Sequence, residues 1–446
     1  MNETLTQESI AVEALESHYR RVEDGIAFDA AEDYAKLVTP NSNSSEPFHR
    51  WFHMKEAYSA GLLQQVVKDC GLDDVHRGLR ILDPFAGSGT TAVSAAKLEP
   101  TPAVWGVECN PFLHLLASVK HEAMQVRPSG LVSLAEEVTI RADSRTTTPE
   151  RFSRPALSTF KNKKYFPQDE LRRLLALVDE LDSLAKIGDD LKVDLLRLAA
   201  AASVEPVSNL RRDGRALRYW PRKDRAHAYR EFLRRAQEMA DDIDLCSAAA
   251  NGRQLLGDGR RMSCIPEDLS FDLAIFSPPY PNNIDYTEVY KLEAWLLGMI
   301  SNRDEFRLQR LRTVHSHPSI RRPVPTDSCI AIDGIVAPIL ACIEPGRYAA
   351  GLADMIQGYV LDLVELFESL ACRLRDGGYI ACAVGNSVHG APGTGVVVAA
   401  DVLVLAAARI AGFEPQRIAV ARNLTRRKHG SAYLRESVCF ITREGR

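Results

Sequence analysis

The 446-residue sequence lacks several features that would assign it to a specialised class of protein. Its nine cysteines are scattered without a CxxC pair, which disfavours a zinc site or a disulfide framework and favours a reducing cytoplasm. The net charge of -4 excludes a uniformly basic surface, so nucleic-acid contact requires a local basic region. The start of the chain shows no signal peptide, and the apolar run at 396–408 is interrupted by Asp401 and too short to span a bilayer. We expect a cytoplasmic globular protein without a membrane segment.

Short apolar segments alternate with helical patterns over much of the chain, which predicts an α/β fold with a doubly wound, mostly parallel sheet. The expected strands lie at 79–83, 103–107, 254–258, 271–276, 379–384, 417–421 and 437–442. The last two are joined by a basic loop and predict an antiparallel hairpin at one sheet edge. Residues 125–250 show helical patterns without a clear strand, and a further helix is expected from Phe48 to Val67.

A glycine-rich turn follows the first of these strands. Gly87 and Gly89 let the backbone approach a ligand closely, and the next helix offers free N–H groups. A phosphate-binding loop is disfavoured because no lysine precedes the threonines, and a dinucleotide motif lacks its third glycine, where Ala92 stands. Glu108 ends the next strand about 20 residues later, where a carboxylate can accept hydrogen bonds from both hydroxyls of a ribose.

The second informative motif is Ser277-Pro278-Pro279-Tyr280, which directly follows an apolar strand. An exocyclic base amine is a poor nucleophile, because its lone pair is delocalised into the ring. The Ser277 hydroxyl and the Pro278 carbonyl can accept the two amine hydrogens, and both prolines stiffen the loop. Tyr280 offers a ring on which an extruded base can stack. We predict that this tetrapeptide is catalytic.

Together the two motifs resemble the S-adenosylmethionine-dependent methyltransferases that modify exocyclic amino groups of nucleic-acid bases. The resemblance covers 48–124 and 252–300, with a looser match at 347–442. It implies a Rossmann-like class I methyltransferase fold, with a seven-stranded sheet, a C-terminal antiparallel strand and a helical insertion. It also implies S-adenosylmethionine as cofactor. No metal is expected, since His315 and His317 lack further ligands at suitable spacing.

The resemblance also assigns cofactor-binding residues. They are Asp83, Pro84, Phe85, Ala86, Gly87, Ser88, Gly89, Thr90, Glu108, Cys109 and Asn110 around the glycine loop, Asp258 for the adenine amino group, and Trp51 and Lys55 in a covering segment. Asp143 is an alternative to Asp258, and Ser59 to Lys55. The implied division of the chain is an N-terminal helical extension and linker (1–46), a first catalytic part (47–124), a helical insertion that is a possible nucleic-acid-binding region (125–250), and a second catalytic part (251–446).

Nucleic-acid contact is predicted at a basic run in the insertion. Between Arg211 and Arg235 the sequence contains ten basic residues and only three acidic ones. The predicted contacts are Arg211, Arg212, Arg215, Arg218, Tyr219, Arg222 and Lys223, with Arg426 and Arg427 in the C-terminal hairpin. A solvated helix face is the alternative. A further basic stretch, from Arg303 to Arg322, follows the tetrapeptide and could add to target recognition.

The resulting prediction is a DNA methyltransferase that modifies a flipped base, with restriction or phage-defence components as possible partners. A serine at the start of the tetrapeptide favours N4 of cytosine over N6 of adenine. Many cytosine-N4 enzymes, however, carry the tetrapeptide before the glycine loop, and here the order is reversed, so the target base stays open. An RNA enzyme such as a tRNA guanine-N2 methyltransferase, and a non-catalytic subunit that binds cofactor and DNA, are the alternatives.

Overall fold

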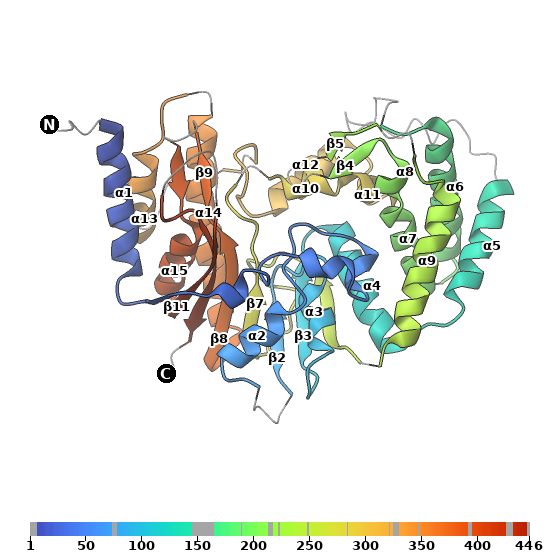
Figure 1. Ribbon diagram of the computed structural model, residues 1–446, viewed down its shortest axis with the longest axis horizontal. Coiled ribbons are helices and arrows are strands. Elements are labelled where there is room, and N and C mark those ends of the chain that lie inside the picture. The colour runs from blue at the N-terminus through green and yellow to red at the C-terminus, as the bar shows by residue number, and fades with distance from the viewer. Residues whose placement is uncertain are drawn as a thin grey trace.

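Eight strands form the central sheet, in the order β1-β11-β12-β8-β7-β2-β3-β6 (Figure 1). The computed structural model describes residues 7–73, 78–144, 165–188, 190–212, 217–221, 224–247, 249–282, 284–320, 322–323, 330–346, 348–390, 395–424 and 431–443. The strands of the sheet are β1 Ala27–Ala30, β2 Arg80–Asp83, β3 Ala103–Glu108, β6 Asn251–Leu256, β7 Phe271–Phe276, β8 Leu374–Gly385, β11 Glu414–Asn423 and β12 Arg435–Thr442.

All seven predicted strands lie in this sheet. β12 runs antiparallel to both of its neighbours, β11 and β8, and the other neighbouring pairs are parallel. The predicted doubly wound, mostly parallel α/β fold with an antiparallel C-terminal strand is therefore confirmed.

Strand β7 shows why these sequences form a sheet that is covered on both sides. All six of its residues are buried. Leu273 and Ile275 pack into the core on one face, and Ala274 and Phe276 into the core on the other, as the two-residue period of a strand requires. A continuous apolar run of this kind is typical of a parallel strand with helices on both faces.

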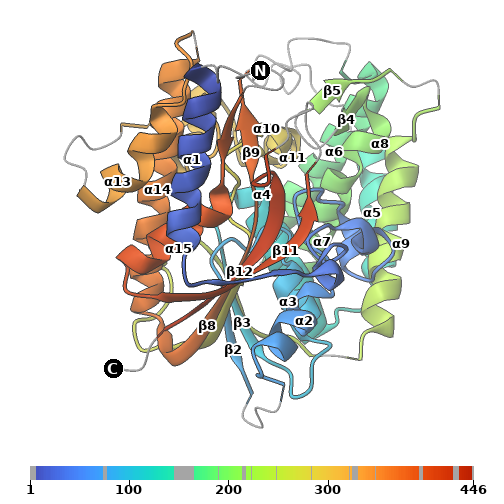
Figure 2. The same cartoon turned by 60° about the vertical axis from the view of Figure 1, so that its left-hand side comes forward.

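Two groups of helices supply those cores. One face carries α13, α14 and α15, with α1 packed against α13 and α15 (Figure 2). The other face carries α2 and α3. These helices are α1 Gln7–Glu23, α2 Leu62–Asp69, α3 Thr90–Ala95, α13 Ile330–Leu340, α14 Ala349–Ala371 and α15 Ala400–Ile410. Among the described residues, no helix combines the length and apolar character needed to cross a membrane.

The insertion forms a helical layer at the β6 end of the sheet, packed on α4 (Pro111–Val126). Its helices are α5 Leu131–Ser144, α6 Gln168–Ala185, α7 Leu191–Ala202, α8 Val204–Val207 and α9 Ala228–Leu245. It also contains a hairpin of β4 (Leu210–Arg212) and β5 (Leu217–Tyr219), which the helical patterns did not predict. After β7 come α10 Tyr286–Val289, α11 Lys291–Leu296 and α12 Arg303–Arg312, and a second small hairpin, β9 Ser387–His389 with β10 Val396–Val398, follows β8.

Two predictions about the N-terminal region were wrong. The helix expected from Phe48 to Val67 is a short 3-10 turn at His49–Trp51, and α2 begins only at Leu62. Phe48 has a φ of 63°, which no α-helix allows, and its N–H donates to Asp242 of α9 (2.9 Å). The segment before it was expected to be helix and linker. It does contain the helix α1, but it also supplies β1, an eighth strand beyond the predicted seven, which pairs in parallel with β11 and occupies the edge expected for the C-terminal hairpin.

Candidate active site

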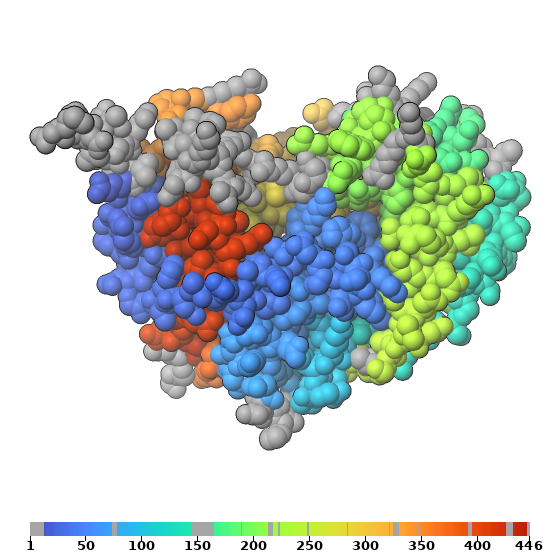
Figure 3. Space-filling view, in the orientation of Figure 1, coloured from blue at the N-terminus to red at the C-terminus, as the bar shows by residue number. Residues whose placement is uncertain are grey.

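The glycine loop and the Ser-Pro-Pro-Tyr tetrapeptide line one cavity of about 240 Å³. They are almost 200 residues apart in the sequence, but β2 and β7 are hydrogen-bonded neighbours in parallel orientation. Their carboxyl ends therefore reach the same edge of the sheet, where doubly wound folds bind ligands. In the space-filling view, the molecule is hollowed along its upper edge between the insertion and the C-terminal part (Figure 3).

Asp83 ends β2 and organises the glycine loop from below. Its Oδ1 accepts a hydrogen bond from the N–H of Phe85 (3.1 Å), and its Oδ2 accepts from the hydroxyls of Tyr58 (3.3 Å) and Thr91. Asp83 is 2% exposed and does not line the cavity, and burial raises the pKa of its carboxyl to about 6. We infer that Asp83 holds the loop in shape from beneath, which corrects the sequence-based prediction that Asp83 contacts the cofactor directly.

The turn needs glycine at Gly89. Its φ is 76°, and a Cβ there would lie 3.0 Å from the Cα of Ala117 in α4, which leaves no room for a side chain. Five of the predicted cofactor residues sit beneath the loop surface and do not line the cavity: Asp83, Ala86, Ser88, Gly89 and Thr90. Seven others line it: Pro84, Phe85, Gly87, Glu108, Cys109, Asn110 and Asp258.

Glu108 ends β3 and faces this cavity. Its Oε2 accepts the N–H of Gly87 (2.9 Å) and its Oε1 accepts the N–H of Asn110 (2.7 Å), which fixes the carboxylate across the loop. Each oxygen keeps a second lone pair for a hydroxyl donor. Burial raises the pKa of Glu108 to about 7, against the opposing effect of these two backbone donors. Asn110 in turn caps α4 by accepting the N–H of Phe112 (3.0 Å).

The covering segment is only partly where the sequence predicted it. Lys55 lines the cavity, although its Nζ donates to the carbonyl of Arg212 (2.7 Å). Trp51 does not line it, which corrects the prediction of a cofactor contact. Its ring is fully buried, and its Nε1–H donates to Asp242 of α9 (2.8 Å). An aromatic side chain near a turn was here a packing residue. Ser59 is also buried, and it hydrogen-bonds to Ser42 (2.9 Å).

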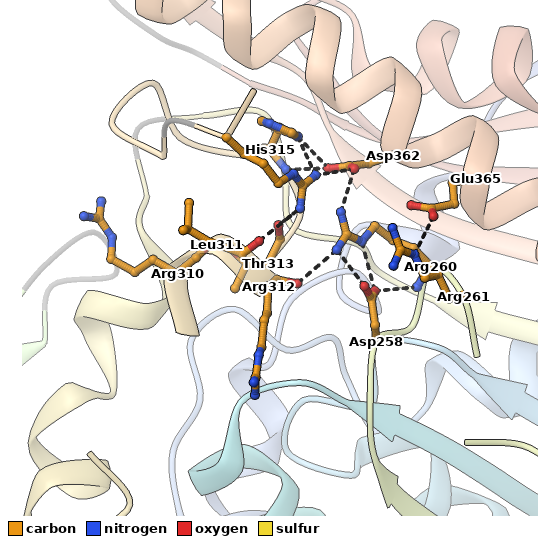
Figure 4. A network of polar contacts seen from close by, with 11 residues as sticks. Asp258, Arg260, Arg261, Arg310, Leu311, Arg312, Thr313, His315, Asp362 and Glu365 are labelled. Carbon is orange, nitrogen blue, oxygen red and sulfur yellow. Dashed lines mark hydrogen bonds and ion pairs between the residues drawn. The ribbon is translucent and has the colours of Figure 1, made fainter. Parts of the chain in front are cut away.

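Asp258 follows β6 and lines the cavity, and its carboxylate is paired with the guanidinium of Arg260 (Figure 4). Arg260 donates from Nε to Oδ1 (2.9 Å) and from Nη2 to Oδ2 (2.6 Å). The same guanidinium donates to Asp362 of α14 (2.7 Å). This bidentate pair fixes the rotamer of Asp258 and leaves its side chain 28% exposed. Asp143, the alternative, is exposed at the end of α5 and does not line the cavity.

The network continues into the segment after α12 (Figure 4). Arg260 donates to the carbonyl of Arg312 (3.3 Å), and Asp362 accepts the backbone N–H of His315 (2.8 Å). Because 312–314 and Ser316 line the cavity, the network fixes one of its walls. Sequence reasoning missed Arg260 and Asp362. A single acid on the buried face of a long apolar helix was the available signal for Asp362.

The tetrapeptide follows β7 and is held by three contacts of Tyr280. Ser277 Oγ donates to the Tyr280 hydroxyl (3.1 Å), which donates to Glu436 Oε1 of β12 (3.3 Å). The N–H of Tyr280 donates to the hydroxyl of Tyr286 (3.3 Å). A Cβ on Gly385 would lie 2.9 Å from the Tyr280 ring, so the ring is pressed against the end of β8. Burial raises the pKa of Tyr280 well above its usual value, and the phenol stays protonated.

No protein-family model matches the chain. Among curated proteins, it is 24% identical to the Type II methyltransferase M.BsoBI of Geobacillus stearothermophilus, over 90% of this chain and 87% of that protein. It is 27% identical to the Type II methyltransferase M.AvaI of Nostoc sp. and of Anabaena variabilis, over 62% of this chain and 59% of each relative. The chain is thus similar to Type II methyltransferases along most of its length. The predicted resemblance to S-adenosylmethionine-dependent DNA amino-methyltransferases is thereby confirmed.

The similarity to solved structures is low. The rRNA methyltransferase aviRa from Streptomyces viridochromogenes is similar at a TM-score of 0.32, with 11% identity over 93% of this chain and 96% of that one. A second structure of the same protein gives the same TM-score at 13% identity, over 86% of this chain and 100% of that one. At so low a score the likeness carries no argument about substrate.

In the structure, the basic run of the insertion has an exposed part and a buried part. Arg211, Arg218 and Tyr219 lie exposed on the β4–β5 hairpin, and the guanidinium of Arg211 lies 5.7 Å from the centre of the exposed Trp220 ring. Five of the predicted contacts fall outside the described residues: Arg215, Arg222, Lys223, Arg426 and Arg427.

Arg212 points the other way, which corrects its assignment to nucleic acid. It is 7% exposed and forms ion pairs with Glu205 (2.8 Å) and with Glu293 of α11, and its Nε donates to the carbonyl of Val289 (3.4 Å). In a strand, neighbouring side chains face opposite sides, so Arg211 and Arg212 cannot both face a ligand. Arg212 instead joins the hairpin to α10 and α11, next to the tetrapeptide.

We expect Arg212→Met to destabilise the protein by about 3–5 kcal/mol, because the fully buried Glu293 would lose its cation. The neighbouring Arg211→Met, at an exposed position, should leave stability within about 0.5 kcal/mol. Urea denaturation followed by circular dichroism measures both. Equal stability of the two variants would contradict the buried role of Arg212.

Proposed function

We propose that the protein transfers the methyl group of S-adenosylmethionine to the exocyclic amino group of a base flipped out of DNA, preferentially N4 of cytosine. As a relative of the Type II methyltransferases, the chain is a methyltransferase with S-adenosylmethionine as its methyl donor. The observation that carries the proposal is the shared cavity, in which the glycine loop and Ser277 to Tyr280 face one space.

The residues of the cavity fit this cofactor. The Gly87 backbone leaves room for a ligand over the loop, and a φ of 50° explains why the position has no side chain. Glu108 has two oxygens fixed side by side, as two adjacent ribose hydroxyls require. Asp258 lines the same cavity, with part of its carboxylate exposed for the adenine amino group. Phe85 adds apolar surface to the cavity.

The bound cofactor supplies an electrophilic methyl group on a sulfonium. The amine nitrogen of the base would accept this methyl group and release one proton to solvent water. Ser277 and the Pro278 carbonyl hold the amine hydrogens, which turns the nitrogen lone pair out of the ring plane and toward the methyl group. Tyr280, fixed by Ser277, Glu436 and Gly385, provides a rigid aromatic ring on which the base can stack.

Three observations support the remaining parts of the proposal. The serine of the tetrapeptide favours cytosine N4 over adenine N6, and the relatives are named as Type II methyltransferases. The exposed Arg211, Arg218 and Tyr219 lie on a hairpin that Arg212 joins to α10 and α11, and α10 lines the cavity. We assign 47–124 and 251–446 to catalysis and 125–250 to DNA contact, with a restriction or phage-defence partner and a cytoplasmic location for the microbial setting.

The proposal is tested by incubating the protein with methyl-labelled S-adenosylmethionine and either unmodified genomic DNA or bulk tRNA, followed by nucleoside mass spectrometry. We expect label in N4-methylcytosine from DNA. Label in N6-methyladenine would correct the base, and label in tRNA alone would replace DNA by RNA. Cofactor binding without any transfer would contradict an independent enzyme and favour a regulatory subunit.

A further inference from the structure

The segment from Met54 to Ala57, called the covering segment, lines the same cavity as the glycine loop. A Cβ at Gly87 would lie 3.4 Å from Cε and 3.5 Å from Sδ of Met54, so this segment is in contact with the loop. In the proposed binding mode, the methionine end of the cofactor lies over that loop. The polar side chains of the covering segment are therefore its nearest candidates for contact.

Glu56 is the acid in this segment. Its Oε2 accepts a hydrogen bond from the hydroxyl of Tyr290, while its Oε1 is buried and has no hydrogen-bond partner among the residues that the structure describes. Glu56 also lines the cavity. A buried acceptor without a donor is destabilising in the free protein, so a ligand donor explains its position better than packing does. Burial raises the pKa of Glu56, because the charged carboxylate loses water there, and a cation beside it would lower the pKa again.

Asp83, Glu108 and Lys55, the other charged residues at the glycine loop and in the covering segment, are already engaged. Both oxygens of Asp83 accept protein donors, and Asp83 does not reach the cavity. Both oxygens of Glu108 accept backbone N–H groups and are assigned to ribose. Lys55, a cation, donates to a backbone carbonyl and has no acceptor to offer. Glu56 is the acid of the covering segment with an oxygen left to accept a proton donor.

We propose that Glu56 binds the α-ammonium group at the methionine end of S-adenosylmethionine, with Tyr290 holding the carboxylate in place. This inference rests on the proposed function, since it requires that cofactor in the cavity. An ammonium carries three hydrogen-bond donors and a positive charge. It therefore complements the Oε1 atom of Glu56, which is buried and accepts no hydrogen bond from the described residues. The alternative use of Glu56, a hydrogen bond to the target base, is separated by the experiment below.

The test compares two ligands in titration calorimetry with the full-length protein. S-Adenosylhomocysteine carries the α-ammonium group, whereas 5′-methylthioadenosine has the same adenosine and a thioether but no amino-acid end. We expect Glu56→Gln to lower the affinity for S-adenosylhomocysteine by about 10–100-fold, which is the range for loss of a hydrogen bond to a charged group. Binding of 5′-methylthioadenosine should stay within about twofold, which also shows that the variant is folded.

The control is Glu288→Gln, the same substitution at a nearby acid that pairs with Lys291 and does not line the cavity. It should leave both affinities unchanged. The inference is overturned if Glu56→Gln weakens both ligands equally, or if it weakens neither and only raises the KM for DNA, which would assign Glu56 to the base. Failure of wild-type protein to bind either ligand would instead refute the proposed cofactor, and the inference with it.

Discussion

Replacement of Ser277 by alanine is expected to lower the single-turnover rate of methyl transfer by about 10²–10³-fold, the usual cost of removing one group that stabilises a transition state. Ser277 has two tasks in the structure. It accepts an amine hydrogen in the proposed mechanism, and its Oγ donates to the Tyr280 hydroxyl (3.1 Å). Because the proposed mechanism places Ser277 against the target base and not against the cofactor, the dissociation constant for S-adenosylhomocysteine should change by less than about twofold.

The measurement is incorporation of label into unmodified DNA with saturating cofactor and excess enzyme. Ser301→Ala, at an exposed position before α12, is the matched control and should be fully active. Tyr280→Phe keeps the stacking ring and should lose less activity than Tyr280→Ala. Product formation by the double variant Ser277→Ala, Tyr280→Ala at a rate near that of the wild type would show that the tetrapeptide is not the catalytic group.

The parts of the fold that the sequence predicts are those with a local physical signal. The apolar runs of β7 and β2 mark strands buried on both faces, and the glycine at position 89 marks a turn that tolerates no side chain. Each strand is followed by a motif for which the sequence predicts a function. The structure adds that β2 and β7 pair in parallel, so that both motifs lie at one edge of the sheet and line one cavity.

The parts that the sequence could not predict depend on contacts between distant segments. The strand β1 has no buried position, so its four residues show no alternating pattern, and only pairing with β11 makes them a strand. The helix expected after Phe48 is replaced by bonds from that segment to Asp242. Arg212 looked like its neighbour Arg211, although the two lie on opposite faces of a hairpin that was itself unexpected.

Lys120 is expected to make the stability of the protein depend on pH. It lies in α4 with no exposed surface, and its Nζ donates to the carbonyl of Ser88 in the glycine loop (2.9 Å). Burial lowers the pKa of this ammonium to about 7. The unfolded chain, with an ordinary lysine pKa, therefore binds more protons than the folded protein above pH 7, so this group makes stability rise with pH up to about 10. Its destabilising effect is complete below pH 7.

The substitution Lys120→Met removes this dependence while it keeps an unbranched side chain in the core. Relative to the variant, wild-type protein should gain about 2 kcal/mol in free energy of unfolding between pH 7 and pH 9. Effects of other groups cancel in that difference. His49, whose pKa is lowered to about 3 by burial first and then by Lys120 and Lys97, stays neutral throughout the range.

Urea denaturation of both proteins at each pH measures the difference. Lys97→Met is the control, because Lys97 is an exposed lysine paired with Glu46, and its difference from wild type should not vary with pH. A wild-type-to-Lys120→Met difference that is equal at pH 7 and pH 9 would mean that Lys120 keeps an ordinary pKa, and hence that the space beneath the glycine loop admits water. A difference that changes with pH would mean that Lys120 is a neutral amine at pH 9, shielded from water beneath the loop on which the cofactor is proposed to lie.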